Sequence, residues 1–324
     1  MRSFALFIFF FSVQAIAQNR TQPKTQPQEL GQVSWYRNYN VAAQQARTTN
    51  KPILILFQEV PGCATCRNYG MDVLSNPLLV EAIEDLFIPL AIYNNKGGDD
   101  KKVLDYYQEP SWNNPVVRIV DSTGTNIVER LAGHYSTYSL YKQMKKALSR
   151  EKKLIPPYFE LLGEELSAES NDSKEEVYYE MYCFWSGEKA LGAADGVLGT
   201  DAGFVGHSEV VKVTFDKQVI SEDDLTDYAE QNGCKKISGT PKYRGSSSDQ
   251  EYYLKHSNYR YLPLSELQKT KINSALAKGK SAEIYLSPSQ KRWLDELTKN
   301  KARNKKELYQ LEFKKAWKIK IGSK

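Results

Sequence analysis

The sequence predicts two domains that contain both helices and strands, and the first of them is an α/β domain. A continuous apolar run over residues 53–57 fits a strand that is buried on both faces, as in the centre of an α/β sheet. Cys63 and Cys66 follow this run at once as a Cys-x-x-Cys pair. A second strand-like run, residues 177–182, ends in Cys183, before another predicted helix. The length of 324 residues suits two domains of ordinary size.

Composition supports packed cores and limits the expected partners. Hydrophobic residues make up 41% of the chain and aromatic residues 12%, which is enough for cores over most of its length. The formal net charge of +5 is modest and does not by itself imply nucleic acid, so we expect no nucleic-acid partner. Positive charge gathers in residues 291–324. A helix packed by one face is the simpler interpretation of that segment, and contact with an anionic lipid or polymer is the alternative.

The N-terminal segment has the pattern of a secretory signal. Arg2 supplies a positive charge, residues 4–13 are apolar apart from Ser12, and Ala15-Ile16-Ala17 gives a small-x-small cleavage pattern. The apolar run is too short to cross a bilayer comfortably, and an uncleaved anchor is the alternative. We expect an exported protein, periplasmic or secreted, that is cleaved near Ala17 and has no transmembrane segment in its mature chain.

The four cysteines are too few for a disulfide scaffold in a chain of this length. An even number in an exported protein suggests two pairs. Cys63 and Cys66 form the local pair, which leaves Cys183 and Cys234. Four cysteines allow three connectivities, and the sequence alone does not choose between them.

Residues 33–150 are expected to alternate helices and strands. In chain order the pattern predicts a helix over 35–46, a strand over 53–57, helices from Cys66 and over 77–86, a strand over 87–92, a helix over 101–107, strands over 116–120 and 126–131, and a closing helix over 137–150. The turn Asp121-Ser122-Thr123-Gly124 separates the last two strands.

This order of elements, with Cys63-Ala64-Thr65-Cys66 at a strand-to-helix corner, resembles the thioredoxin fold. Pro115 matches the proline, cis in that family, that faces the Cys-x-x-Cys pair, and the resemblance makes it a candidate substrate-binding residue. The preceding Val60-Pro61-Gly62 further resembles a group of thioredoxin-like proteins and selenoproteins named for a Val-Pro-Gly-selenocysteine motif. That resemblance implies that Cys63 is the attacking residue.

The spacing of this pair suits thiol chemistry. Cys63 lies just before a predicted helix, whose dipole favours the thiolate, and Cys66 lies one turn later, where it can resolve a mixed disulfide. A zinc site is the alternative, but the sequence has no second Cys-x-x-Cys pair or histidine pair to complete four ligands. We therefore expect a redox pair, with no metal and no cofactor.

The second domain is expected to begin near residue 175. Its predicted elements are a strand over 177–182, a helix over 184–194, a glycine-rich segment over 196–209, a strand over 210–215, a helix from Ser221 to Gly233 with Cys234 just past its end, and helices over 265–277 and 289–297. Tyrosines at 252, 253, 259 and 261 indicate core or a peptide-binding surface. The expected boundaries are a signal at 1–17, a flexible spacer at 18–32, domains at 33–150 and 175–297, a linker at 151–174 and a basic tail at 298–324.

Two segments of the second domain resemble peptide methionine sulfoxide reductase A. The family's Gly-Cys-Phe-Trp-Gly motif appears as Tyr-Cys-Phe-Trp-Ser over 182–186, and its Gly-His-x-Glu-x-Val segment appears as Gly-His-Ser-Glu-Val-Val over 206–211. Tyr243-Arg244 is a weaker match to the family's later Tyr-Arg pair. The family's substrate loop is missing, and Phe204 replaces a tyrosine that hydrogen-bonds the sulfoxide oxygen. The predicted fold class is thus α/β and α+β, a thioredoxin-like domain followed by a domain like this reductase.

The resemblance implies a role for each site residue. Cys183 attacks the sulfoxide sulfur, and Glu209 protonates the departing oxygen. The resemblance implies that three aromatic residues bind the substrate: Phe184, Trp185 and Phe204. The first two would line a pocket for the methyl group. Attack releases methionine and leaves a sulfenic acid on Cys183, and Cys234 is the candidate thiol that converts it into a disulfide.

These inferences predict an exported thiol oxidoreductase that reduces free or peptide-bound methionine sulfoxide. The N-terminal Cys-x-x-Cys domain would be its fused reductant, and an upstream thiol reductant would be its partner. The alternative is a thiol–disulfide oxidoreductase that acts on protein disulfides, with the second domain as a degenerate reductase that binds clients. A non-catalytic binding module with buried, inert cysteines is a third interpretation.

Overall fold

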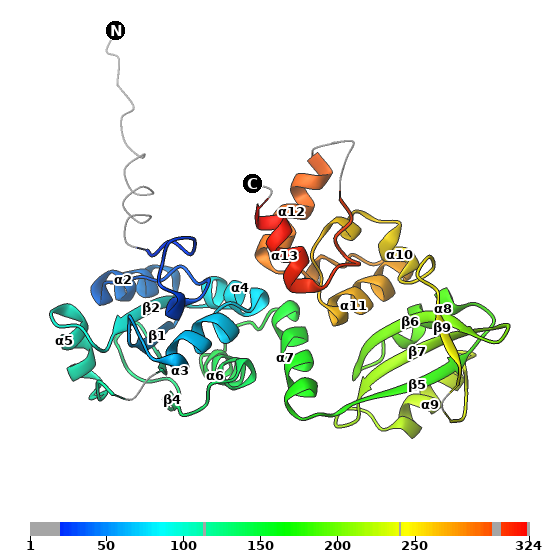
Figure 1. Cartoon of the computed structure of the whole chain (residues 1–324), viewed down its shortest axis with the longest axis horizontal. Coiled ribbons are helices and arrows are strands. Elements are labelled where there is room, and N and C mark those ends of the chain that lie inside the picture. Colours follow the sequence, from blue (N-terminus) through cyan, green and yellow to red (C-terminus); the bar gives the residue numbers. More distant parts are fainter. Residues whose placement is uncertain (1–19, 113–114, 240, 300–305, 323–324) are drawn as a thin grey trace, which may run out of the picture. The chain divides into compact units, whose positions relative to one another are not determined.

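The computed structural model describes residues 20–112, 115–239, 241–299 and 306–322 (Figure 1). These residues form two compact units, and the division falls between Leu154 and Ile155. No helix in the described ranges is long and apolar enough to cross a membrane. The expected signal, residues 1–17, lies outside the described residues.

The first unit is built on a four-stranded sheet with the order β2-β1-β3-β4. Its strands are β1 (Ile53–Gln58), β2 (Ile88–Tyr93), β3 (Val116–Val120) and β4 (Leu131–Ala132). β1 pairs parallel with β2 and antiparallel with β3, so it lies in the centre of the sheet. All six of its residues are buried, which confirms the strand that the apolar run predicts.

Helices cover both faces of this sheet. They are η1 (Gln28–Leu30), α2 (Tyr39–Thr49), α3 (Ala64–Asn68), η2 (Tyr69–Val73), α4 (Pro77–Leu86), α5 (Asp99–Tyr106) and α6 (Thr137–Arg150). Ile53, Ile55 and Phe57 share one core cluster with residues of α2 and α5. Leu54 and Leu56 alternate with them and are also fully buried, so the opposite face is covered as well.

Two predicted elements of this unit are wrong in extent. The helix expected from residue 35 begins only at Tyr39, because Asn38 caps it by accepting the Val41 N–H at 3.1 Å. The strand expected over 126–131 is reduced to β4 and one isolated bridge at Asn126. Side chains of the closing helix satisfy carbonyls of that stretch instead: Arg150 donates to the Ile127 oxygen at 2.7 Å.

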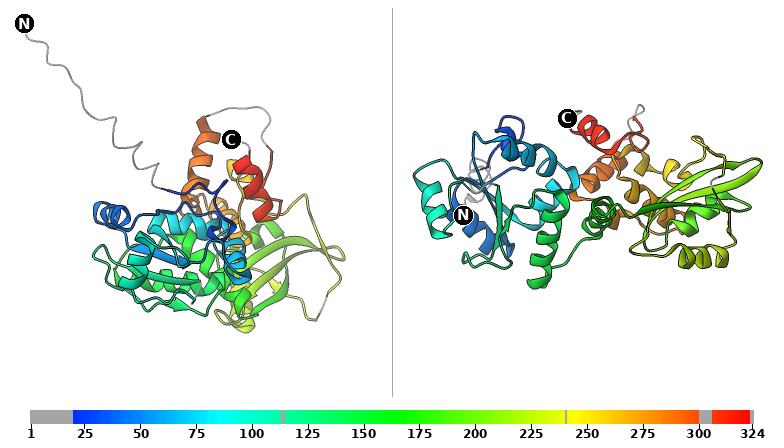
Figure 2. Two further views of the ribbon diagram at one scale, coloured as in Figure 1. Left: turned by 60° about the vertical axis from the view of Figure 1, so that its left-hand side comes forward. Right: turned by 60° about the horizontal axis from the view of Figure 1, so that its bottom comes forward.

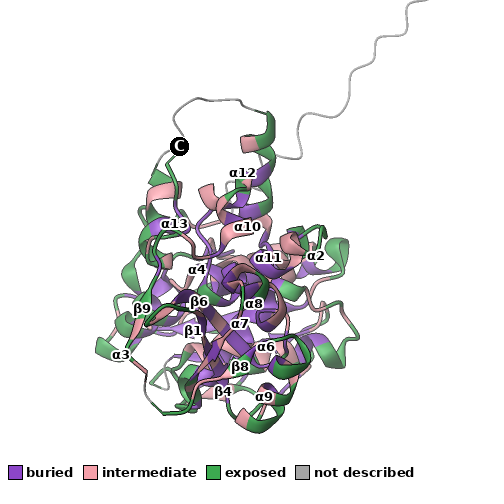
Figure 3. Cartoon of the chain, turned by 90° about the vertical axis from the view of Figure 1, so that its right-hand side faces the viewer, coloured by how far each residue is buried: buried purple, intermediate pink, exposed green. Residues whose placement is uncertain are grey.

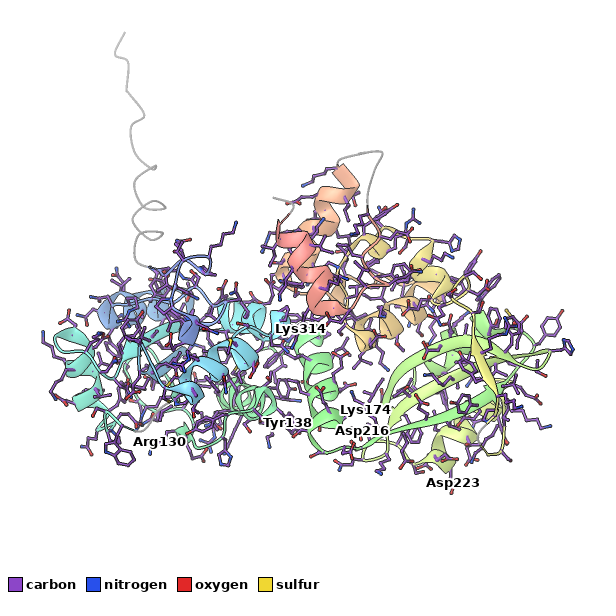
Figure 4. All side chains as sticks on the ribbon, in the orientation of Figure 1. Arg130, Tyr138, Lys174, Asp216, Asp223 and Lys314 are labelled. Atoms are coloured by element: carbon purple, nitrogen blue, oxygen red, sulfur yellow. The ribbon has the colours of Figure 1, made fainter. Side chains whose placement is uncertain are left out.

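The second unit contains a five-stranded antiparallel sheet with the order β8-β5-β7-β6-β9 (Figures 1 and 2). Its strands are β5 (Lys174–Glu180), β6 (Val197–Val205), β7 (Ser208–Asp216), β8 (Lys235–Lys236) and β9 (Tyr243–Gly245). Figure 4 labels Lys174 and Asp216, the residues paired at one end of β5 and β7. Helices α8 (Phe184–Leu191) and α9 (Glu222–Gln231) share one apolar core with this sheet.

Strand β6 lies within the segment 196–209, for which the sequence predicted only a high glycine content. The glycines serve strand packing and a tight turn. A Cβ at Gly203 would lie 2.5 Å from the Arg244 carbonyl oxygen, so glycine allows β9 to approach. Gly206 has a φ of 61° in the two-residue turn to β7, a conformation that favours glycine. The register is therefore a hairpin in which Phe204 pairs with Glu209.

The remaining helices complete the second unit. They are α7 (Pro157–Ser170), α10 (Tyr252–Lys255), η3 (Asn258–Tyr261), α11 (Glu266–Ala277), η4 (Glu283–Tyr285), α12 (Pro288–Lys299) and α13 (Phe313–Gly322). Helix α7 lies within the segment expected to be a linker, and α13 lies within the expected basic tail. Trp317 of α13 is buried and packs edge-on against Trp293 at 5.0 Å between ring centroids. Figure 3 shows the buried residues of both units along their strands and the inner sides of their helices.

Candidate active site

The Cys-x-x-Cys pair of the first unit lies where β1 leads into α3. Cys63 is the N-cap of α3 and is exposed, whereas Cys66 is buried in its first turn. Their sulfur atoms are 3.6 Å apart, and both are free thiols. The two thiols are therefore close enough to form a disulfide after a small movement.

The two sulfurs lie in different environments, which shift their pKa values in opposite directions. A hydrogen bond from the backbone N–H of Cys66 lowers the pKa of Cys63. Burial raises the pKa of Cys66 to about 11. The exposed sulfur is thus the one that loses its proton more readily, and the buried one holds its proton more strongly. Such a pair suits attack by Cys63 and resolution by Cys66.

Buried polar groups hold the turn before Cys63. Glu29 is 5% exposed, and its Oε1 accepts the Gly62 N–H at 2.8 Å. Asn95 accepts the Val60 N–H and donates to the Pro61 oxygen, each at 3.2 Å. Glu29 lies in the segment expected to be a spacer, and a lone glutamate in a Gln- and Pro-rich stretch gives no sequence signal for this contact.

Pro115 lies at the same end of the sheet as the Cys-x-x-Cys pair. Val116 pairs with Phe57 in the antiparallel register of β3 and β1, so the buried Pro115 is at the end where β1 continues into the turn before Cys63. Asn114, the other half of its peptide bond, lies outside the described residues.

A carboxylate adds a third possible metal ligand to this pair. One oxygen of Glu59 and the sulfurs of Cys63 and Cys66 all lie within 4.8 Å of one another. Tetrahedral structural zinc sites have four protein ligands, and this group of described residues supplies three. The donor set therefore falls one short of such a site.

Cys183 in the second unit occupies a comparable place, the N-cap of α8, and is half-buried. Glu209 on β7 reaches the same helix end, where its Oε2 accepts the Phe184 N–H at 2.9 Å. The structure thus brings a carboxylate to the residue that follows the thiol, although Cys183 and Glu209 are 26 positions apart in the sequence.

Aromatic rings surround this helix end. The Phe184 ring packs edge-on against Phe204 at 5.6 Å and lies 5.9 Å from Trp185 between centroids. Trp185 stacks on Tyr252 at 4.1 Å. The three predicted aromatic residues therefore form one cluster, and Tyr252 extends it. The sequence marks Tyr252 only as a member of a tyrosine group, because its partner is 67 residues away.

A buried acid links α8 to the segment that carries Tyr252. Glu188 is fully buried, and both of its carboxylate oxygens lie 3.1 Å from the Glu251 nitrogen, whose N–H they accept. Burial raises the pKa of Glu188 well above its usual value. Glu188 is not among the site residues predicted from the sequence. Its spacing, four residues after Phe184 on the buried face of a predicted helix, was the available signal.

Cys234 lies in the same apolar core as Phe184, just past α9. Its sulfur lies 3.8 Å from the Asn232 oxygen, and burial raises its pKa. Glu180 pairs with Lys235, so Cys234 lies near the end of β5, from which the chain runs on to Cys183. Both thiols are free. The structure places them in one region of the second unit without a bond between them.

Comparisons with known proteins found similarity to both of the families that the sequence resembles. Residues 34–122 match the family model described as thioredoxin-like. Three curated relatives are peptide methionine sulfoxide reductases MsrA: 28% identical over 93 residues in Vibrio vulnificus, 35% over 68 in Methanococcus maripaludis and 27% over 82 in Maricaulis maris. These matches cover 24%, 16% and 20% of this chain, and 44%, 43% and 38% of the relatives. The chain thus spans less than half of each relative's length.

Among solved structures, a DsbH oxidoreductase aligns with 42% of this chain and 99% of its own, at 16% sequence identity. Its TM-score of 0.32 supports no further conclusion. The family match and the curated relatives confirm the predicted organisation: a thioredoxin-like domain joined to a region similar to MsrA, in an α/β and α+β fold.

Proposed function

We propose that the second unit reduces methionine sulfoxide through Cys183 and that the Cys-x-x-Cys unit returns it to the thiol form. The main support is the position of Glu209, whose carboxylate is hydrogen-bonded at the N-terminus of the helix that Cys183 caps. A nucleophile and an acid at one point are what sulfoxide reduction needs. The likeness to MsrA relatives points to the same substrate class.

The reaction can be written with these residues alone. The Cys183 thiolate attacks the sulfoxide sulfur while Glu209 gives a proton to the oxygen. Methionine leaves, and Cys183 becomes a sulfenic acid. The Cys234 thiol condenses with it to a disulfide and releases water. Glu209 lies beside Phe184 and Phe204, next to the helix end that Cys183 caps.

The first unit would then supply electrons. The Cys63 thiolate attacks the Cys183–Cys234 disulfide, and Cys66 releases it by forming the Cys63–Cys66 disulfide. The lowered pKa of Cys63 and the raised pKa of Cys66 support this order. An upstream thiol reductant would complete the cycle. We also propose that the chain is exported, on the pattern of residues 1–17.

Turnover of free and peptide-bound methionine sulfoxide by the full chain tests this proposal. Cys183→Ser should abolish turnover with any reductant. The double variant Cys63→Ser/Cys66→Ser should keep turnover driven by dithiothreitol and lose turnover driven by a protein reductase. Full reductase-coupled activity in the double variant would contradict the role of the first unit.

A second function, reduction of protein disulfides, is favoured by the exposed Cys63 thiol beside a buried partner. In that case Cys183 and Cys234 would form a stable structural disulfide. Insulin reduction by the full chain, together with mass spectrometry of Cys183 and Cys234 after mild reductant, separates the two. Insulin turnover that survives Cys183→Ser, with a Cys183–Cys234 bond that resists reduction, would support the second function.

A further inference from the structure

Arg244 lies on the same face of the second sheet as Glu209. Phe204 of β6 pairs with Glu209 of β7 on one side and with Arg244 of β9 on the other. Residues directly opposite one another on antiparallel strands point to the same face. The side chains agree, because the Phe204 ring packs on Phe184 and the Glu209 carboxylate accepts the Phe184 N–H. The row Glu209–Phe204–Arg244 therefore faces the helix end that Cys183 caps.

The guanidinium of Arg244 is held in place and is open to solvent. Its Cζ lies 5.2 Å from the Phe204 ring centroid, within the range of a cation–π interaction. Arg244 is exposed, and no ion pair joins it to an acidic group in the part of the chain that the structure describes. By contrast, Lys212 and Lys217, on and after β7, each pair with a glutamate. Arg244 is thus a positioned cation whose charge is available to a ligand.

We infer that Arg244 binds a carboxylate of the substrate. The carboxylate is either the α-carboxylate of free methionine sulfoxide or the side chain of an acidic residue beside a peptide-bound one. This inference rests on the proposed function, because it concerns the same site. The planar fork of arginine matches a carboxylate and can donate two parallel hydrogen bonds to it.

The spacing of the row suits a substrate of this kind. Neighbouring strands lie about 4.8 Å apart, so the backbones of Glu209 and Arg244 are about 10 Å apart across β6. The Glu209 carboxylate contacts that helix end directly, and the Arg244 guanidinium lies over the Phe204 ring, which packs on Phe184. A sulfoxide at Cys183 and a carboxylate a few bonds away can therefore be contacted together.

Binding in the Cys183→Ser background, where no turnover occurs, tests the inference on the full chain. Isothermal titration calorimetry compares N-acetyl-L-methionine sulfoxide with its amide, which lacks the carboxylate. The acid should bind about tenfold more tightly or better, as expected of a charge-assisted contact. Arg244→Gln should remove this preference and leave the affinity for the amide unchanged. Lys217→Gln, which deletes a positive charge at the other end of the sheet, should keep the preference.

A second pair of ligands identifies the source of the carboxylate. Acetyl-Glu-methionine sulfoxide amide and its Gln counterpart differ only in the acidic side chain. Tighter binding of the Glu ligand than of the Gln ligand would identify the acidic side chain as the group that Arg244 binds. A difference in affinity that appears only in the first pair would identify the α-carboxylate. Equal binding within both pairs, or no binding at all, would overturn the inference. Carboxylate-dependent binding without turnover by the unsubstituted chain would instead contradict the proposed function alone.

Discussion

Glu209 accepts a hydrogen bond from the residue that follows the candidate nucleophile, and this contact has two explanations. As a structural group, the carboxylate satisfies one of the free N–H groups at the start of α8. As a chemical group, it can hold and deliver a proton near the Cys183 thiol. The two explanations separate in a glutamine variant, because glutamine keeps an acceptor oxygen for Phe184 but has no acidic proton.

We therefore expect Glu209→Gln to lower kcat for methionine sulfoxide by about a hundredfold or more, the usual contribution of a general acid. The urea midpoint of unfolding should stay close to that of the unsubstituted chain. Glu176→Gln, which removes an exposed carboxylate from β5 of the same sheet, is the control and should keep its activity. Turnover of Glu209→Gln within a factor of about two of the control would show that the carboxylate only caps the helix.

At the scale of the element, β6 depends on a glycine that the close approach of β9 requires. Gly203→Ala would place a Cβ 2.5 Å from a backbone oxygen of Arg244, so β9 must move. We expect the free energy of unfolding to fall by about 1–3 kcal/mol. Gly199→Ala in the same strand is the matched control, since its Cβ would meet Thr214 only at 3.7 Å. Equal urea stability of the two variants would contradict this account.

Three acids whose pKa burial raises, Glu165, Glu188 and Glu251, give the second unit a dependence on pH. Burial raises the pKa of Glu251 from its usual 4.5 to about 7, although Lys269 at 3.8 Å opposes the shift, and it raises the pKa of Glu188 as well. Between pH 4.5 and 7 the folded state then binds more protons than the unfolded state. Its stability therefore falls as the pH rises through that window, by at most about 3 kcal/mol for Glu251.

Urea unfolding, monitored by hydrogen exchange of peptides from the second unit, should thus show a larger free energy of unfolding at pH 5 than at pH 8. Glu251→Gln should reduce the difference. Glu283→Gln, which changes an exposed glutamate of the same unit, should leave it unchanged. Identical stability of the unsubstituted chain at the two pH values would refute the buried-acid explanation.

Local signals explain which elements the sequence predicts correctly. The apolar run of β1 and the Ser221 cap of α9 are contained in a few consecutive residues, and both predictions are confirmed. β6 was missed because its glycines resemble those of a loop, and only contact with β9 shows their use. The contact of Glu29 with Gly62 joins residues 33 positions apart, so no local pattern predicts it.

At the scale of the whole molecule, the two units share one feature, a cysteine at the N-cap of a helix. Cys63 and Cys66 in one unit, and Cys183 and Cys234 in the other, each comprise an N-cap cysteine and a buried cysteine. The two thiol systems are complementary if electrons pass from the first to the second. Joining them in one chain raises their effective concentration to about the millimolar range, provided that the connecting segment lets them meet.

A mixture of two full-length variants separates transfer within one chain from transfer between chains. One variant is Cys63→Ser/Cys66→Ser and the other is Cys183→Ser, so each lacks one half of the pathway and neither can couple alone. At about 1 μM of each, reductase-coupled turnover should be far below that of the unsubstituted chain, because the effective concentration within one chain is about a thousandfold higher. It should rise as both concentrations increase, while turnover driven by dithiothreitol stays constant per molecule of the first variant. Turnover by the dilute mixture equal to that of the unsubstituted chain would mean that the two units exchange electrons between molecules and gain nothing from being joined.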